Sequence, residues 1–114
     1  MSDGMTTILY PVTDLDAAKA TFRALLGVEP AQDTPYYVGF EVGGQTIGLD
    51  PGGHQRGMRG GVGYVEVDDI AGRLQALLAA GAETVEDVHD VGGGKLIASV
   101  RDADGNVLGL MQTP

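Results

Sequence analysis

Tyr10-Pro11-Val12-Thr13-Asp14-Leu15 has a counterpart later in the chain, Val65-Glu66-Val67-Asp68-Asp69-Ile70. In both places a short β-branched and apolar run leads to an Asp that suits a helix N-cap. Apolar residues at helical spacing follow, and each helical stretch stops at a glycine, Gly27 in the first copy and Gly81 in the second. The chain therefore predicts two similar units.

A second pair of matching segments follows each helix. Gly44-Gln45-Thr46-Ile47-Gly48-Leu49 resembles Gly105-Asn106-Val107-Leu108-Gly109-Leu110, and each segment begins at a hairpin signal, Gly43-Gly44 or Asp104-Gly105. A repeat of this length is too long for a solenoid unit and too short for an independent domain. We expect the two units to share one sheet and to enclose a binding site between them.

The predicted order of elements is strand, helix and three strands in each unit. This makes a single α+β domain with module 1 at about 5–51, a Gly-rich linker at 52–61 and module 2 at about 62–114. In module 1 we expect strands at 6–12, weakly at 30–34, at 36–42 and at 45–50, with a helix from Leu15 that Gly27 ends. In module 2 we expect strands at 62–67, 84–88, 95–101 and 107–111, with a helix from Ile70 that Gly81 ends.

Composition excludes several classes of protein. The chain has 114 residues and no cysteine, which excludes disulfides, a thiolate nucleophile and a zinc–sulfur site. No apolar run approaches the roughly 20 residues that span a bilayer, and residues 1–7 lack the pattern of a secretory signal. We therefore expect a cytoplasmic protein. A net charge of −9 opposes binding to nucleic acid and permits a cationic ligand.

The duplicated pattern resembles the vicinal oxygen chelate superfamily, also called the glyoxalase/bleomycin resistance/dioxygenase fold. The matching segments are Val12–Asp16 with Leu25-Leu26-Gly27, then Val65–Asp69, and finally Asp102–Leu110. The resemblance implies two βαβββ modules that form a half-open, barrel-like curved sheet with the helices outside. It also implies a homodimer, because compact members of this family usually pair.

Metal-dependent members of this family place His, Glu or Gln on four inward-facing strands. Counted from the shared motifs, those positions fall here at Thr7, Gly48, Val62 and Gly109. Zinc, nickel and iron need imidazole, carboxylate or thiolate donors, which these four side chains lack. We therefore expect no metal at the usual location and no cofactor. The resemblance implies that the drug-binding branch of the family, which binds its ligand without a metal, departs from the metal-ligand pattern in the same way.

Strand alternation predicts which side chains face the cavity. If Gly48, Val62 and Gly109 point inward, their neighbours two residues away do so as well. The concave face then has small residues that leave space for a ligand. The predicted ligand-contacting residues are Tyr37, Tyr64 and Met111 as apolar contacts, Asp50, Glu66, Lys95 and Arg101 as polar anchors, and His54 near the cavity mouth.

The roles of the two histidines stay open at this point. Asp50 and His54 could form a pair in which a carboxylate orients an imidazole base. The same two residues could contribute to a metal site away from the usual location. The alternative is that His54 and His89 are both solvated loop residues without a specific role.

Three functions are compatible with this pattern. The leading expectation is a metal-independent small-molecule-binding protein that sequesters an antibiotic or toxin, with a cationic ligand favoured by the acidity. A second is a glyoxalase-like lyase or isomerase, or a dioxygenase-type enzyme, that uses a displaced metal or metal-free acid–base chemistry through Asp50, His54 or Glu66. A third is a dimeric regulatory module without a ligand.

Overall fold

The computed structural model describes residues 4–114 and divides the chain into two compact modules. Module 1 is residues 6–62, and module 2 is residues 63–114 together with Gly4 and Met5. Each contributes one strand, one helix and three further strands, so the predicted α+β class with two βαβββ modules is confirmed. The stretch considered for a secretory signal includes residues 1–3, which lie outside the described residues.

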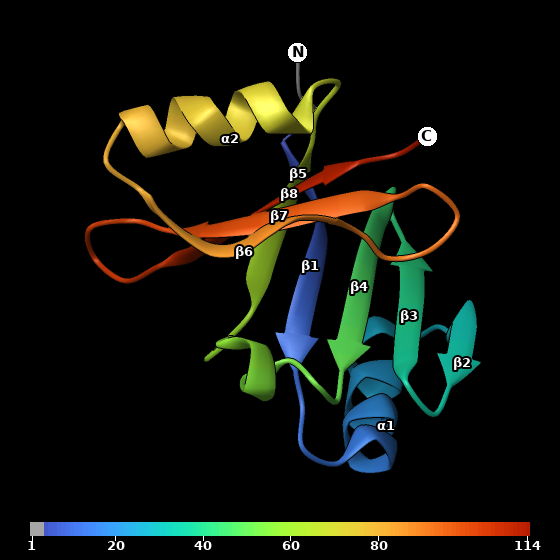
Figure 1. Cartoon of the computed structure of the whole chain (residues 1–114). Helices are drawn as coiled ribbons and strands as arrows, with labels where there is room; N and C mark the ends of the chain where they lie inside the picture. Colours follow the sequence, from blue (N-terminus) through green and yellow to red (C-terminus); the bar gives the residue numbers. More distant parts are fainter. Residues whose placement is uncertain (1–3) are drawn as a thin grey trace. The chain divides into compact units, whose positions relative to one another are not determined.

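Module 1 has a mixed sheet with strand order β2-β3-β4-β1 (Figure 1). β1 is parallel to β4, and the other pairings are antiparallel. Its elements are β1 (Met5–Pro11), α1 (Leu15–Leu26), β2 (Gln32–Thr34), β3 (Tyr37–Val42), β4 (Gln45–Asp50) and a 3₁₀ turn, η1 (His54–Arg56).

Module 2 repeats this arrangement with strand order β5-β8-β7-β6. β5 is parallel to β8, and β8, β7 and β6 pair in antiparallel fashion. Its elements are β5 (Val62–Glu66), α2 (Ile70–Ala79), β6 (Glu83–Asp90), β7 (Leu96–Arg101) and β8 (Val107–Gln112).

Both helices begin and end where the sequence indicates. The carboxylate of Asp14 accepts a hydrogen bond from the N–H of Ala17 at 3.1 Å, and Asp69 accepts one from Gly72 at the same distance. These bonds satisfy N–H groups that have no partner within the helix. Gly27, with φ of 73°, then ends α1 in the left-handed conformation that glycine adopts without strain.

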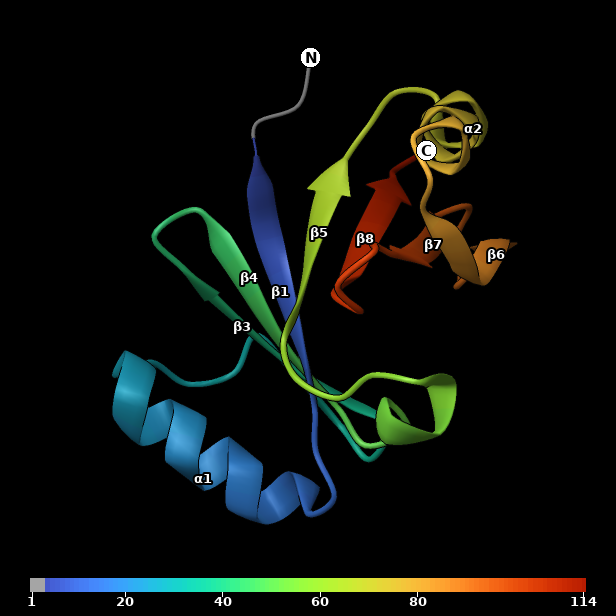
Figure 2. The same cartoon turned by 90° about the vertical axis from the view of Figure 1, so that its left-hand side faces the viewer.

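Each helix packs on one face of its own sheet. In module 1 the core is built from Val38 and Phe40 of β3 with Ile47 and Leu49 of β4, and α1 covers them (Figure 2). In module 2, α2 inserts two buried side chains, Ile70 and Leu74, against the strands. α1 contains no fully buried residue, so it covers its sheet less completely.

Several boundaries differ from the prediction by one or two residues, and the structure of β6, Lys95 and the linker departs from it as well. β6 is longer than expected, because two register shifts allow it to stay paired with β7 over eight residues. Lys95 lies in the turn before β7 and not in the strand. The segment 52–61 contains η1, and Met58 within it is buried, so it is more than an open linker.

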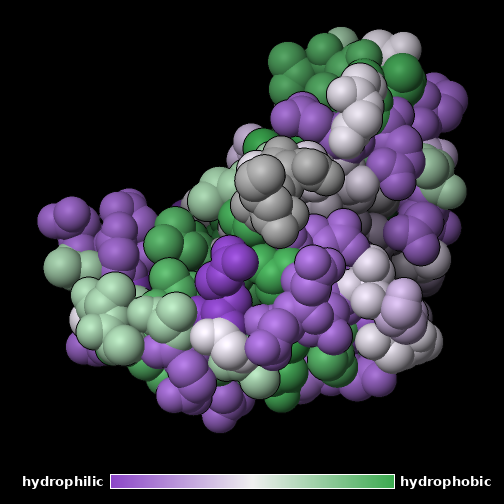
Figure 3. Space-filling view, turned by 90° about the horizontal axis from the view of Figure 1, so that it is seen from above, coloured by the Kyte–Doolittle hydropathy of each residue, from purple (hydrophilic) through white to green (hydrophobic). Residues whose placement is uncertain are grey.

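The surface combines polar and apolar groups. The view from above shows hydrophilic side chains interrupted by separate hydrophobic groups (Figure 3). The large hydrophobic side chains that are exposed come from four different segments, at Met5, Leu25, Tyr36 and Val91. No helix within residues 4–114 is long and apolar enough to cross a membrane.

Candidate functional site

The sheet of module 1 has one face turned toward α1 and one turned away from it. Because Val38, Phe40, Ile47 and Leu49 pack toward the helix, the alternate residues of β3 and β4 lie on the other face. We call this second surface the module 1 face. It comprises Leu9, Tyr37, Gly39, Glu41, Thr46, Gly48 and Asp50, which agrees with the predicted alternation.

The ring of Tyr37 lies over two glycines of this face. A Cβ atom added at Gly48 would be 2.6 Å from the Tyr37 hydroxyl and 2.8 Å from its Cε1, and one added at Gly39 would be 2.9 Å from Cε2. No side chain fits at these positions while the ring stays there. The expectation that the glycine at 48 leaves empty space is therefore wrong, because the space is filled by an aromatic ring.

The surroundings of this tyrosine favour its neutral form. Partial burial raises the pKa of the Tyr37 phenol above its usual 10.0, and the negative charge of Glu41 raises it further. Glu41 is itself oriented by Thr46, whose hydroxyl donates to the Glu41 carboxylate at 2.7 Å. Module 1 thus presents a neutral aromatic ring beside a carboxylate that is held in place.

Asp50, which we predicted as a ligand anchor, has partners within its own turn. One carboxylate oxygen accepts from the Gly52 N–H at 2.8 Å, and the other pairs with the guanidinium of Arg56. Asp50 is only 8% exposed. His54 lies in η1 and is exposed, so the carboxylate is committed to Arg56 and Gly52 where we had considered a pairing with His54.

A corresponding surface exists in module 2. Ala98, Val100 and Leu110 pack toward α2, so the alternate residues of β7 and β8 lie on the opposite side, which we call the module 2 face. A Cβ atom added at Gly109 would be 2.6 Å from Cγ of Tyr64. Tyr64 is therefore stacked directly on this glycine, and the residue is only 6% exposed.

The other predicted residues of module 2 occupy different environments. Met111 is buried and pairs across the sheet with Ile97. Glu66 is exposed and accepts a hydrogen bond from the hydroxyl of Thr113. Arg101 ends β7 on the module 2 face and is partly exposed. Lys95 occupies the β6–β7 turn, where its backbone bonds with Gly92 and Val91 close the turn.

Sequence reasoning missed two residues of the module 2 face. Glu86 pairs across the sheet with Ser99, and His89 pairs with Ile97, so both project on the side opposite α2. Residues three apart in a regular strand point to opposite faces. The register shift between them reverses that rule. The only sequence signal was the unusual density of titratable residues at 86–90.

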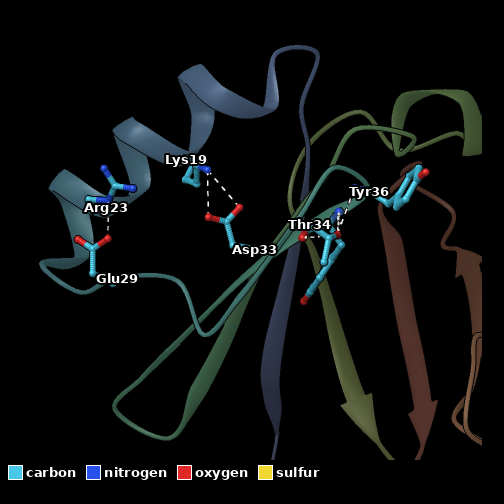
Figure 4. Close-up of polar contacts among 7 residues, drawn as sticks. Lys19, Arg23, Glu29, Asp33, Thr34 and Tyr36 are labelled. Atoms are coloured by element: carbon cyan, nitrogen blue, oxygen red, sulfur yellow. Dashed lines mark hydrogen bonds and ion pairs between the residues drawn. The ribbon is translucent and has the colours of Figure 1, made fainter.

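A hollow of about 750 Å³ lies at the start of α1, on a different part of module 1. Two of its charged groups are engaged with each other: Lys19 of α1 bonds to Asp33 of β2 at 3.1 Å. Outside its lining, Arg23 pairs with Glu29 at 3.2 Å (Figure 4). These contacts fasten the helix to the strand that follows it. The hollow is lined by Thr13, Asp14, Leu15, Asp16, Lys19, Asp33, Thr34 and Pro35.

The residues do not fit a metal at the positions that the family resemblance indicates. Gly48 and Gly109 have no side-chain donor, and tyrosine rings cover both. Within residues 4–114, no group of three His, Asp or Glu side chains is arranged to hold an ion. Gly48 and Gly109 themselves therefore offer no side-chain ligand for a divalent ion.

The sequence matches the family described as Glyoxalase/Bleomycin resistance protein/Dioxygenase superfamily over residues 4–110. A search of curated proteins found no match. Among solved structures, the fold is similar to a Legionella pneumophila protein named NAD-dependent benzaldehyde dehydrogenase, with a TM-score of 0.77, 13% identity, and coverage of 95% of this chain and 98% of that one.

Two further structures have the same fold. Methylmalonyl-CoA epimerase from Mycobacterium tuberculosis gives a TM-score of 0.74 at 18% identity, covering 99% of this chain and 89% of that one. A superfamily member from Vibrio splendidus 12B01 gives 0.72 at 16% identity, with coverage of 99% and 100%. At these identities the likeness shows the fold alone.

Proposed function

Because the chain belongs to the glyoxalase/bleomycin resistance protein/dioxygenase superfamily, we propose that it is a metal-independent protein that binds a small organic molecule. The observation that carries this proposal is the placement of Tyr37, whose ring rests on Gly39 and Gly48 and remains partly exposed. A ring seated on glycines offers a flat apolar contact surface at a position where metal-dependent relatives need an ion ligand. The fold is thus adapted to contact a ligand directly.

The charges of module 1 favour a cationic ligand. A neutral tyrosine attracts a cation to its ring face, and a phenol whose pKa is 10.0 or higher, such as Tyr37, is neutral at physiological pH. The Glu41 carboxylate next to it, oriented by Thr46, supplies the opposite charge. A net charge of −9 adds a long-range attraction for cations.

The wider biological role follows from this chemistry. A protein that binds a cationic organic molecule without transforming it would protect the cell by sequestering an antibiotic or toxin. We place this activity in the cytoplasm and in a homodimer. Cross-linking and sedimentation of the purified protein test the dimer, and fractionation of the source cells tests the location.

The experiment begins with a thermal-shift screen against a library of cationic and neutral aromatic compounds. A ligand present at 100 times its dissociation constant should stabilise the protein by about 2.7 kcal/mol. Hits are then measured by calorimetry against Tyr37→Ala and Glu41→Gln, with Tyr36→Ala as the matched control. Tyr36 is the adjacent tyrosine and is 82% exposed.

The expected result is that Tyr37→Ala abolishes binding and Tyr36→Ala leaves it intact. Glu41→Gln should weaken the binding of a cation such as benzyltrimethylammonium more than the binding of a neutral compound of the same shape. If no compound raises the melting temperature, or if Tyr37→Ala binds hits as tightly as the natural sequence does, the proposal is wrong.

A further inference from the structure

Strand β2 places Gln32 at the edge of the module 1 face. Gln32 pairs with Gly39 of β3, and Gly39 pairs in turn with Gly48 of β4. The next residue, Asp33, points to the opposite side of the sheet, where it pairs with Lys19 of α1 at 3.1 Å. Because side chains alternate along a strand, Gln32 projects on the side away from α1, as Tyr37 does.

The side chains of Gln32 and Tyr37 meet above one glycine. A Cβ atom added at Gly39 would be 3.4 Å from the side-chain oxygen of Gln32 and 3.3 Å from the hydroxyl oxygen of Tyr37. Both polar atoms therefore lie close to the same point, although they come from different strands. They are neighbours because Gly39 has no side chain to separate them.

Neither polar group is committed to the protein. Among residues 4–114, the Tyr37 hydroxyl and the Gln32 side-chain amide make no hydrogen bond to another residue. In the same part of the chain no buried polar side-chain atom lacks a partner, so the Tyr37 hydroxyl is reached by solvent. Gln32 is exposed. A ligand therefore replaces solvent at both groups without breaking a hydrogen bond within the protein.

The backbone that carries the two groups is held in place. The hydroxyl of Thr34 accepts from the N–H of Tyr37 at 3.0 Å and donates to the Tyr37 carbonyl oxygen at 3.0 Å. The N–H of Ala31 donates to the carbonyl oxygen of Gly39 at 2.8 Å, which ties the start of β2 to β3. A contact surface that is ordered before binding loses less entropy when a ligand arrives.

The chemistry of the pair is complementary to an amide. A neutral phenol donates through its O–H, and the oxygen of a carboxamide side chain accepts. A carboxamide group on a ligand carries the matching carbonyl oxygen and N–H side by side. An ester keeps the carbonyl but has no N–H, so it would pair with the phenol alone.

We propose that Gln32 and Tyr37 together select a ligand that bears a carboxamide group. The Tyr37 hydroxyl donates to the carbonyl oxygen of that group, and the side-chain oxygen of Gln32 accepts from its N–H. This inference rests on the proposed function and names the ligand class more closely, as an aromatic cation that also carries an amide. Gln32 is then the residue that sets specificity, whereas Glu41 and the ring of Tyr37 attract the cation.

The test compares three probes by calorimetry on the full chain: benzyltrimethylammonium, its para-carboxamide derivative, and the methyl ester of the corresponding para-carboxylic acid. The carboxamide should bind about fivefold more tightly than the ester, which is the contribution of one additional hydrogen bond. Gln32→Leu should remove this preference and leave the binding of benzyltrimethylammonium unchanged. Tyr37→Phe keeps the ring, so it should weaken both carbonyl compounds and still bind benzyltrimethylammonium.

Gln45→Leu is the matched control. Gln45 is an exposed glutamine of the same sheet, and it alternates with Thr46 so that it lies on the α1 side with Ile47. This variant should keep the preference for the carboxamide. Circular dichroism verifies that each variant is folded before it is titrated.

Two results overturn the inference: equal binding of the carboxamide and the ester by the natural sequence, or a preference that persists in Gln32→Leu. If the probes bind without that preference and Tyr37→Ala abolishes their binding, the inference fails and the proposed function stands. If none of the three probes binds, the proposed cationic ligand and this inference fail together.

Discussion

The two modules share an order of elements and a glycine at the same point of the last strand, yet they cover that glycine differently. In module 1, Leu9 lies across from Gly48, and the covering ring comes from Tyr37 on the other neighbouring strand. In module 2, Tyr64 lies directly across from Gly109 and covers it. The two modules thus share a glycine at the same backbone position, but the aromatic ring that covers it comes from a different strand in each.

The tyrosine and the helix are more deeply buried in module 2 than in module 1. Tyr64 and two residues of α2 are buried, whereas Tyr37 remains partly exposed and α1 has no buried residue. We interpret module 2 as the more rigid half and module 1 as the half with an aromatic ring available for contact. Paired substitutions in the two modules test this difference.

The largest expected effect concerns the helices. Leu74→Ala in α2 should lower the free energy of unfolding by about 2–5 kcal/mol, because it leaves a cavity in a packed core. Leu26→Ala in α1 should cost less, since Leu26 is only partly buried. Urea denaturation of both variants measures the difference. Equal losses would show that the two helices anchor their modules equally.

The glycines give the next largest effect. Gly109→Ala should destabilise by about 1–3 kcal/mol, because the added methyl group meets the inner atoms of the buried Tyr64 ring. Gly48→Ala should cost less, since it meets the far ends of Tyr37 and Leu9, which can move. Gly60→Ala, with no heavy atom within 4 Å, is the control. A greater loss for Gly48→Ala would reverse our ranking of the two modules.

The ionisation of Tyr37 is expected to have a smaller effect on the stability of the folded protein. Its pKa is raised, so its contribution to stability is fully present below pH 10.0 and is lost as the pH rises through the higher value of the folded protein. Ultraviolet absorbance should show a late-titrating component that is lost in Tyr37→Phe. Glu41→Gln should lower that pKa part of the way toward 10.0. An unchanged titration in Tyr37→Phe would contradict the assignment.

The smallest effect lies in the hairpin between β7 and β8. Hydrogen bonds from the side chain and backbone of Asn106 lower the pKa of Asp102 below 3.8. Its contribution is therefore present above pH 3.8 and is lost as the pH falls through the lower folded value. Asp102→Asn should reduce the acid dependence of the melting temperature slightly. The hairpin of module 1 turns at Gly43 and Gly44, and there the Glu41 carboxylate accepts a hydrogen bond from the Thr46 hydroxyl across the two strands.

The sequence predicted the fold well because duplication and alternation are local patterns. Capping at Asp14 and the alternation of β3, β4, β7 and β8 followed from spacing alone. It predicted β6 only as a shorter strand at 84–88 and did not predict which side chains share a face, because a bulge breaks the two-residue period without a distinctive residue to signal it. The same limit concealed Glu86 and His89.

The candidate site was predicted less completely, for two physical reasons. The glycines suggested free volume, but only the folded chain shows that Tyr37 and Tyr64 fill it. Asp50 was assigned to a ligand, yet Arg56, six residues later, returns to its carboxylate through η1. Strand alternation predicts which side chains share a face of the sheet, but it does not predict contacts that a turn brings about. Whether the predicted residues contact a ligand stays a prediction.

The kinked course of β6 has a consequence for crowded solutions. A straight outer strand offers a continuous ladder of backbone groups that a neighbouring copy can extend into a fibril. β6 changes register twice within eight residues and carries Glu83, Glu86, Asp87 and Asp90. Such an edge gives incoming chains no regular template and repels acidic copies of itself, so it should resist amyloid growth even at high concentration.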